Sequence, residues 1–393
     1  MNRVLVTGGA GFIGSHVVDL LLEKGYQVTV LDSLEEQVHG SGHKRPKYLS
    51  KKAELIVGDI LDRRTLSNLV TKSDAVIHLA AMVGVGQSMY QIDRYVDVNT
   101  HGTALLLDIL VNDYPPVKKL IVASSMSVYG EGKYICSSCG STCYPSQRSA
   151  ARLSQKQWDH LCPQCGSVLN HVPTDEESTL LPTSIYAMSK RHQEEMCLVT
   201  GKAYKIPTVA LRFFNVYGPR QALSNPYTGV CAIFSSRILN NKPPFIFEDG
   251  KQLRDFVHVR DVARACALAL EGSEADYLPV NVGTGASISV SDIASTLIDL
   301  YGKELQPVIS HEFRTGDIRH CYPDISRANS LLGFKPEIQL KEGLAELVEW
   351  AKVNGWGSVD RFDHALSELK ERELFTTVET TLERNAPSVS GPR

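Results

Sequence analysis

The chain alternates between short runs of apolar residues and longer segments in which apolar residues recur every three or four positions. The first run, Val4 to Val6, contains no polar residue, which is typical of a strand buried on both faces of a parallel sheet. A helical pattern follows from Phe12, Gly25 ends it, and the next apolar run begins at Tyr26. This order predicts a β-α-β unit. Similar apolar runs lie at 55–57, 75–81 and 120–123.

Strands that alternate with helices predict an α/β fold with a doubly wound parallel (Rossmann) sheet. We expect this domain at 1–210, followed by a smaller C-terminal substrate lobe built mostly from 211–360. Residues 131–172 form an insertion within the first domain, and the polar tail at 376–393 is expected to be disordered. An irregular loop is expected at 33–52. Helices are expected at 95–111, 184–200, 262–270, 288–300 and 340–353.

The turn between the first strand and the first helix reads Thr-Gly-Gly-Ala-Gly-Phe-Ile-Gly at 7–14. Glycines let the backbone turn sharply and approach a pyrophosphate closely, and the helix N-terminus offers free N–H groups. Asp32 ends the second strand, where a carboxylate can bind an adenosine ribose and repel a 2′-phosphate. No arginine directly follows it, so the pattern favours NAD over NADP. Tight helix–sheet packing is the alternative explanation for the glycines.

Two further strand ends carry polar residues. Asp59 follows the third strand and could meet the adenine amino group, or it could cap the next helix. His78 is flanked by apolar residues, which is more typical of a hydrogen-bonded core histidine than of a catalyst. The small residues that follow it would let the backbone lie against a cofactor.

A serine-rich segment, 124–130, follows the fifth strand at the sheet edge where open α/β sheets bind ligands. Tyr186 and Lys190 are four residues apart on a predicted helix and therefore share one face. An ammonium beside a phenol favours the phenolate, and lowering that pKa from about 10 to about 7 requires roughly 4 kcal/mol, which we expect from the ammonium together with a positive nicotinamide ring. A surface Tyr–Lys pair is the alternative, which the glycine turn and the serine-rich strand end disfavour.

These motifs, with those at 211–220, 254–262, 281–285 and 314–317, resemble the extended short-chain dehydrogenase/reductase family, and within it the nucleotide-sugar epimerases and dehydratases. The resemblance covers about residues 1–130 and 172–350. It implies that Ser125 binds a sugar hydroxyl, Tyr186 is the acid/base, and Lys190 holds the cofactor ribose. The expected NAD contacts are Gly8, Gly11, Phe12, Ile13, Gly14, Asp32, Asp59, Ile60, Leu79, Ala80, Ala81, Asn99, Ser124, Tyr186 and Lys190.

The resemblance also implies where a nucleotide sugar binds. Arg254 and Arg314 would bind the diphosphate with Asn215, and Tyr227 lies where the family holds the base. A dianionic diphosphate does need arginines and amides in fixed geometry, although a structural ion-pair role for both arginines is the alternative. The expected substrate contacts are Ser125, Ser127, Asn215, Tyr227, Arg254, Arg314 and Asp317.

One difference from the family's motifs narrows the range of reactions that we expect. The family's 4,6-dehydratases carry Thr-Asp-Glu at the serine-rich strand end, where this chain has Ser125-Met126-Ser127. Met126 cannot donate a proton and Ser127 is a poor base near neutrality, so elimination of water is disfavoured. The expected activity is 4-epimerisation by reversible hydride transfer through a 4-keto sugar. A 2-epimerase, a net oxidoreductase and a non-enzymatic NAD-sensing regulator are the alternatives.

The insertion holds two matching Cys-x-x-Cys-Gly knuckles, Cys136/Cys139 and Cys162/Cys165. Two such pairs predict a four-thiolate structural zinc ribbon, with free thiols or a redox pair as the alternatives. Its position before the Tyr186 helix suggests that it borders the mouth of the active site. Together with 227–230, the insertion resembles bacterial proteins assigned as dTDP-L-rhamnose 4-epimerases, which implies conversion of dTDP-L-rhamnose to dTDP-6-deoxy-L-talose.

Composition excludes several other classes of protein. The 393 residues are 43% hydrophobic and 22% charged with a net charge of −3, which supports no nucleic-acid or membrane-surface role. No apolar run approaches the ~18 residues of a membrane span, and we see no export signal. We therefore expect a cytoplasmic enzyme. The apolar helix around 105–110, and the family resemblance, predict a homodimer.

Overall fold

The computed structural model describes residues 1–314, 316–355 and 360–376. Its centre is a sheet of seven parallel strands in the order β14-β9-β5-β4-β1-β2-β3. Each expected strand is present with bounds shifted by a few residues. The strands are β1 (Arg3–Thr7), β2 (Gln27–Asp32), β3 (Glu54–Val57), β4 (Ala75–His78), β5 (Leu120–Ser125), β9 (Thr208–Phe213) and β14 (Pro279–Val282).

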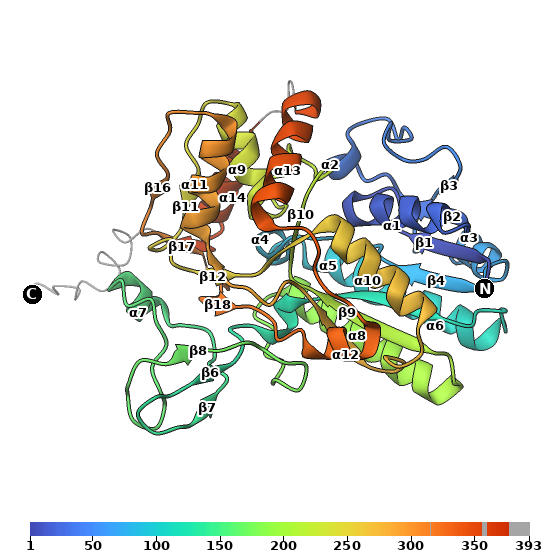
Figure 1. Cartoon of the computed structure of the whole chain (residues 1–393), viewed down its shortest axis with the longest axis horizontal. Helices are drawn as coiled ribbons and strands as arrows, with labels where there is room; N and C mark the ends of the chain where they lie inside the picture. The colour runs from blue at the N-terminus through green and yellow to red at the C-terminus, as the bar shows by residue number, and fades with distance from the viewer. Residues whose placement is uncertain (315, 356–359, 377–393) are drawn as a thin grey trace, which may run out of the picture.

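Helices cover both faces of this sheet (Figure 1). On one face, α1 (Phe12–Glu23), α10 (Val259–Glu271) and α12 (Ser326–Leu332) pack into one apolar core with the strands. On the other face, α3 (Arg63–Val70), α6 (Gly102–Asn112) and α8 (Ile185–Tyr204) form a second core. This is the predicted doubly wound α/β fold, and β1 and β4, adjacent strands from different halves, form its switch point.

Three local features differ from the expected elements. The helix expected at 95–111 is divided into α5 (Ile92–Tyr95), a π-helical segment (Val96–His101) and α6. The loop expected at 33–52 contains a short helix, α2 (Glu36–His39), and α4 (Val85–Ser88) lies between β4 and α5. The sheet also extends beyond the expected 1–210 segment, because β9 continues to Phe213 and β14 comes from 279–282.

A second lobe packs beyond the carboxyl ends of the strands (Figure 1). Its core is built by α9 (Val230–Leu239), α11 (Val290–Tyr301) and α13 (Leu340–Asn354). A further helix, α14 (Phe362–Glu371), follows them. Its short strands are β10 (Asn215–Tyr217), β11 (Phe245–Ile246), β12 (Leu253–Arg254), β13 (Phe256–His258), β15 (Ile288–Ser289), β16 (Val308–Ile309), β17 (Phe313–Arg314), β18 (His320–Cys321) and β19 (Phe375–Thr376).

The cysteine-containing insertion forms its own small lobe, which projects away from the central sheet in Figure 1. Its strands β6 (Tyr134–Ile135), β7 (Thr142–Cys143) and β8 (Asn170–His171) form an antiparallel sheet in the order β7-β6-β8. A short helix, α7 (Ala150–Ser154), lies between the two cysteine pairs, and a 3-10 turn (Met126–Tyr129) leads from β5 toward this lobe.

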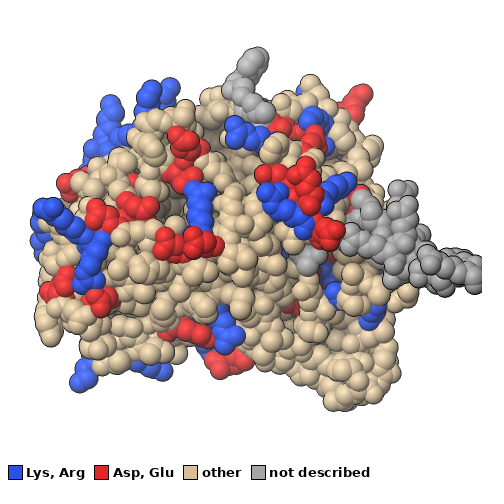
Figure 2. Space-filling view, turned by 180° about the vertical axis from the view of Figure 1, so that it is seen from behind, with Lys and Arg blue, Asp and Glu red and all other residues tan. Residues whose placement is uncertain are grey.

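Three further expectations concern the tail, membrane-spanning helices and the charge of the surface. Apart from Thr376 in β19, the tail expected at 376–393 lies outside the described residues. Among the residues that are described, no helix combines the length and apolar character needed to cross a bilayer. Basic and acidic side chains are interspersed on the face shown in Figure 2, so that face presents no basic stripe of the kind that binds nucleic acid.

Candidate active site

A cavity of about 860 Å³ lies between the carboxyl edge of the central sheet and the second lobe. Its volume is within the range of small-molecule sites. It is lined by the glycine turn of β1 and α1, by the ends of β4 and β5, and by residues of α9, α14 and the loop before β18. One cavity therefore contains both predicted cofactor residues and predicted substrate residues.

The glycine turn has the shape that a phosphate needs. Gly8 has a φ of +69°, and a Cβ there would lie 2.8 Å from the backbone nitrogen of Ala80. A Cβ at Gly14 would overlap the Gly8 carbonyl oxygen and lie 2.6 Å from Gly9 Cα. Gly11 precedes α1 and gives it no side-chain cap, so N–H groups at this helix N-terminus remain available to a ligand.

Asp32 lines the cavity and also supports the turn. Its Oδ2 accepts a 2.9 Å hydrogen bond from the Ala10 amide, and its Oδ1 accepts one of 2.9 Å from the Leu34 amide. Asp59 lines the cavity as well, and its Oδ1 accepts a hydrogen bond from the Leu61 amide. It is not the helix cap of the alternative interpretation, because Asp62 caps α3.

All but one of the predicted NAD contacts face the cavity. The exception is Asn99, whose side chain is fully buried. Its Oδ1 accepts a 2.7 Å bond from the Met82 amide, and its Nδ2 donates to the Met82 carbonyl and to Ser189 Oγ. Asn99 therefore joins the segment after β4 to α8 behind the cavity wall.

Ser125, Tyr186 and Lys190 all line the cavity. Ser125 ends β5, and its hydroxyl accepts a 3.0 Å hydrogen bond from Ser127 Oγ and shares one with Tyr186. Tyr186 and Lys190 come from the first turns of α8, which Ser184 caps by accepting from the Ala187 amide. Lys190 Nζ donates a 2.9 Å hydrogen bond to the Ala123 carbonyl.

Burial dominates the protonation of Tyr186 and Lys190. Burial raises the pKa of Tyr186 to about 12, with the Ser125 hydrogen bond opposing it, and burial lowers the pKa of Lys190 to about 7. Among the chain's own groups, burial outweighs any lowering of the Tyr186 pKa by Lys190. The prediction relies on the Lys190 ammonium acting together with the positive nicotinamide ring, and it stays a prediction. Desolvation favours the neutral form of each group, and the Lys190 ammonium is directed at a carbonyl.

His78 is a core histidine, as expected. Its ring nitrogens lie 2.8 Å from Thr7 Oγ1 and 3.0 Å from Thr103 Oγ1. Burial, and secondarily the charge of Lys190, lowers its pKa to about 3.

This low pKa predicts loss of stability in acid. Unfolding returns His78 to its ordinary pKa near 6.5, so the unfolded chain binds the extra proton between pH 6.5 and 3. The free energy of unfolding should fall by about 1.4 kcal/mol per pH unit in that window for this one group. His78→Gln should reduce the slope of stability against pH, measured by urea unfolding between pH 7 and pH 5, by about one proton. An unchanged slope would contradict this assignment.

The predicted substrate residues all line the same cavity. Asn215 Oδ1 is buried there without a hydrogen-bond partner. Arg254 donates from its guanidinium to the carbonyls of Ile318 and Arg319, at 2.6 and 2.9 Å. Arg314 forms an ion pair with Asp317, so for this arginine the structural alternative also holds. The Tyr227 hydroxyl lies 2.6 Å from that of Tyr90.

Sequence reasoning missed α14. Its residues Phe362, Ala365, Leu366 and Leu369 line the cavity, and Glu368 accepts hydrogen bonds from the Tyr227 and Tyr90 hydroxyls. The strand that follows, β19, pairs with β17 beside Arg314. The spacing i, i+3, i+4, i+7 indicates an amphipathic helix, but no local signal shows where such a helix docks.

The four predicted thiols form one cluster in which all sulfur atoms lie within 4.8 Å of one another. The Sγ atoms of Cys136 and Cys165 are 3.4 Å apart and those of Cys139 and Cys162 are 3.6 Å apart. Tetrahedral Zn–S bonds of about 2.3 Å place sulfurs about 3.8 Å apart, whereas a disulfide requires about 2.05 Å. The donor set therefore fits zinc, and Gly140 and Gly166 provide the positive φ that each knuckle turn requires.

The chain is similar to known proteins over most of its length. The family model described as the NAD dependent epimerase/dehydratase family matches residues 4–152 and 162–283. A dTDP-L-rhamnose 4-epimerase of Burkholderia thailandensis is 36% identical, over 89% of this chain and 94% of that protein. A putative UDP-glucose 4-epimerase of Methanocaldococcus jannaschii is 35% identical, over 89% of this chain and 99% of its own.

Solved structures agree in fold. The UDP-glucose 4-epimerase of Thermotoga maritima, with UDP-glucose, has a TM-score of 0.73 and 32% identity, covering 89% of this chain and 99% of its own. The UDP-glucuronic acid 4-epimerase of Bacillus cereus, in complex with UDP-glucuronic acid and NAD, has a TM-score of 0.72 and 30% identity, with the same coverage. The chain is therefore an enzyme that belongs to the NAD dependent epimerase/dehydratase family.

Proposed function

We propose that the chain is a nucleotide-sugar 4-epimerase that retains bound NAD, with dTDP-L-rhamnose as its substrate and dTDP-6-deoxy-L-talose as its product. The observation that carries this proposal is one shared cavity. Ser125, Tyr186 and Lys190 line it together with the uncapped glycine turn and with Arg254 and Arg314.

The chain's own residues supply binding and proton transfer in this proposal. The glycine turn and Asp32 would hold NAD, which supplies a reversible hydride acceptor when bound. The Tyr186 phenolic oxygen takes the proton from the sugar hydroxyl and returns it, while Ser125 orients that hydroxyl. Asn215, Arg254 and Arg314 bind the diphosphate, and Met126 and Ser127 offer no acid/base pair for elimination.

The choice of sugar rests on resemblance. It is supported by the 36% identity to the Burkholderia thailandensis protein. The relative named a putative UDP-glucose 4-epimerase is 35% identical, so UDP-sugars belong in the same test.

Zinc and dimer formation belong to the same proposal. Four sulfurs would complete the tetrahedral shell of zinc and leave no open position, so the metal is structural.

The apolar residues expected to pair protomers, such as Leu106 and Leu110, are buried in the chain's own core. Exposed apolar side chains lie instead at Ile92, Val96 and Met188, on α5, the π-helical segment and α8, and they support pairing there. Nine cysteines of which none forms a disulfide in the described part of the chain are typical of a reducing, cytoplasmic compartment.

The proposed function predicts C4 epimerisation of dTDP-L-rhamnose by the purified enzyme without added cofactor. NMR would follow dTDP-L-rhamnose, UDP-glucose and UDP-glucuronic acid in parallel incubations. Inversion at C4 of the first sugar, with the highest kcat/KM of the three, is the expected result. Faster turnover of a UDP-sugar would refute the rhamnose assignment, and inversion at C2 or net NADH formation would refute the reaction. No turnover of any sugar by NAD-loaded enzyme would contradict the proposal.

A further inference from the structure

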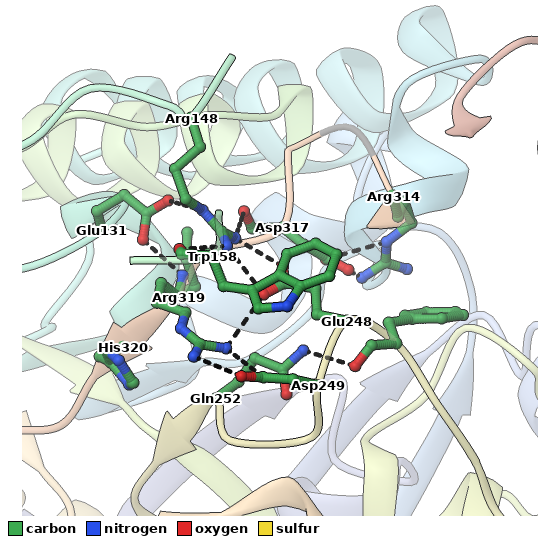
Figure 3. Close-up of polar contacts among 12 residues, drawn as sticks. Glu131, Arg148, Trp158, Glu248, Asp249, Gln252, Arg314, Asp317, Arg319 and His320 are labelled. Atoms are coloured by element: carbon green, nitrogen blue, oxygen red, sulfur yellow. Dashed lines mark hydrogen bonds and ion pairs between the residues drawn. The ribbon is translucent and has the colours of Figure 1, made fainter. Parts of the chain in front are cut away.

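The insertion contacts the second lobe through buried charges. Arg148, which lies between the two cysteine pairs, donates 2.8 and 2.7 Å hydrogen bonds to the two carboxylate oxygens of Glu248. Both side chains are almost fully buried, at 3% and 1% exposure. Figure 3 shows Arg148 extending toward Glu131 and Glu248, with the indole of Trp158 beside its guanidinium. Its Nη2 also donates a 3.1 Å hydrogen bond to the Asp317 carbonyl oxygen.

Asp317 belongs to the segment that runs from Phe313 to Arg319. Arg319, a second arginine, extends the contacts between this segment and the insertion. The Arg319 amide donates a 2.5 Å hydrogen bond to Glu131, and its Nε donates one of 2.9 Å to Asp159. Glu131 and Asp159 both belong to the insertion, whereas Asp249, which pairs with the Arg319 guanidinium at 2.6 and 2.9 Å, belongs to the second lobe. The insertion therefore holds backbone atoms of both Asp317 and Arg319.

The other side of this segment faces the cavity. Asp317 and Ile318 line the cavity, and Asp317 pairs with Arg314. Arg254, at the same wall, is held by the carbonyls of Ile318 and Arg319. Arg254 and Arg314, which would bind the diphosphate, are thus both oriented by this segment. The insertion contacts the segment on its other side, away from the cavity.

An apolar contact fixes the start of the segment. Leu153 and Trp158 of the insertion form a buried cluster with Phe313, which directly precedes Arg314. The insertion thus holds the segment at residue 313 by packing and at residues 317 and 319 by hydrogen bonds.

We propose that the insertion is a positioning element for the substrate diphosphate, and that Arg148 is its principal positioning residue. This inference rests on the proposed nucleotide-sugar substrate. Arg148 touches neither Arg254 nor Arg314; it acts through the backbone of 317 and through Glu248. Removing the Arg148 guanidinium leaves Glu248 without its bidentate partner and frees the Asp317 carbonyl. Arg254 and Arg314 then lose their fixed geometry.

The test compares Arg148→Met with Arg152→Met in the full-length holoenzyme. Arg152 lies in the same insertion and donates to the Asp159 carbonyl, and in the described part of the chain none of its hydrogen bonds reaches 313–314 or 316–319. We expect Arg148→Met to weaken dTDP and UDP binding, measured by calorimetry, at least tenfold. KM for the sugar should rise by a similar factor while kcat changes less than threefold. Bound NAD and metal content should stay unchanged, Arg148→Lys should restore part of the affinity, and Arg152→Met should stay within twofold of the wild type.

A purely structural role would lower the melting temperature and leave nucleotide affinity intact, and that outcome overturns the inference. If Arg148→Met fails to fold, Glu131→Gln keeps the side-chain shape and removes the charge opposite the Arg319 amide. Unchanged nucleotide affinity in that variant overturns the inference in the same way, and a loss of threefold or more supports it. Wild-type enzyme that binds dTDP or UDP but epimerises no sugar refutes the proposed function alone. Wild-type enzyme that binds neither nucleotide refutes both.

Discussion

Tyr186→Phe should lower kcat by about 10²–10⁴-fold, the usual contribution of a positioned acid/base group. The phenol lines the cavity beside Ser125, and desolvation holds its pKa near 12, so it remains protonated at neutral pH until the bound substrate and cofactor change its surroundings. The phenylalanine ring keeps the packing against Tyr95, whose ring meets Tyr186 edge-on at 6.5 Å. NAD content, melting temperature and nucleotide affinity should therefore change little.

Tyr95→Phe is the matched control for this variant. It removes a hydroxyl that donates to Gln87 Oε1 at 3.1 Å and leaves the edge-on ring contact in place. Single-turnover and steady-state rates should stay within about fivefold of the wild type. If Tyr186→Phe kept near wild-type kcat, or if both variants lost activity equally, the acid/base assignment would be wrong.

Gly14→Ala should abolish stable NAD binding and lower the melting temperature markedly. The added Cβ would overlap the Gly8 carbonyl oxygen and approach Gly9 Cα to 2.6 Å, so the glycine turn must open. Because backbone atoms cannot rotate away as a side chain can, we expect a cost at or above the ~3 kcal/mol upper end of ordinary overpacking. The measurements are the absorbance of co-purified NAD per protomer and the melting temperature.

Gly11→Ala is the graded comparison. Its Cβ would lie 3.3 Å from the same Gly8 carbonyl oxygen, a contact that a small shift relieves. Its melting temperature should fall much less than that of Gly14→Ala. Equal melting temperatures and equal NAD content in the two variants would show that the close approach at Gly14 does not control the turn.

Local patterns predicted the parts of the fold and site that depend on local chemistry. The apolar runs placed the first five strands of the central sheet, because a strand buried on both faces needs continuous apolar sequence. The Cys-x-x-Cys-Gly repeats predicted the observed cluster of four sulfurs, and the predicted glycine turn lines the cavity together with Asp32. Each of these features is encoded within a few residues.

The features that were missed depend on contacts between distant residues. The docking of α14 over the cavity joins Glu368 to Tyr90, and Arg148 meets Glu248 across one hundred residues. In neither pair does the sequence spacing indicate that the two residues are in contact. The protonation of Tyr186 was also beyond the sequence, because spacing shows that Lys190 shares a helical face but not that its ammonium bonds to the Ala123 carbonyl.

Burial explains two other differences. Leu106 and Leu110 are apolar because they face the central sheet, so their pattern gave no information about a second protomer. Asn99 was expected at the cofactor, and its carboxamide instead satisfies the backbone of Met82 inside the core. In both cases the sequence shows that a residue is suited to burial or to hydrogen bonding, and only the fold determines its partner.

The central claim is that hydride leaves and returns to the same carbon of the sugar within this cavity. The most direct test is incubation of the holoenzyme in ordinary water with dTDP-L-rhamnose carrying deuterium at C4. Our account predicts an epimerised product that retains the deuterium at C4, because the hydride stays in the enzyme between its two transfers. Replacement of that deuterium by solvent hydrogen would show proton exchange at carbon and would contradict the account.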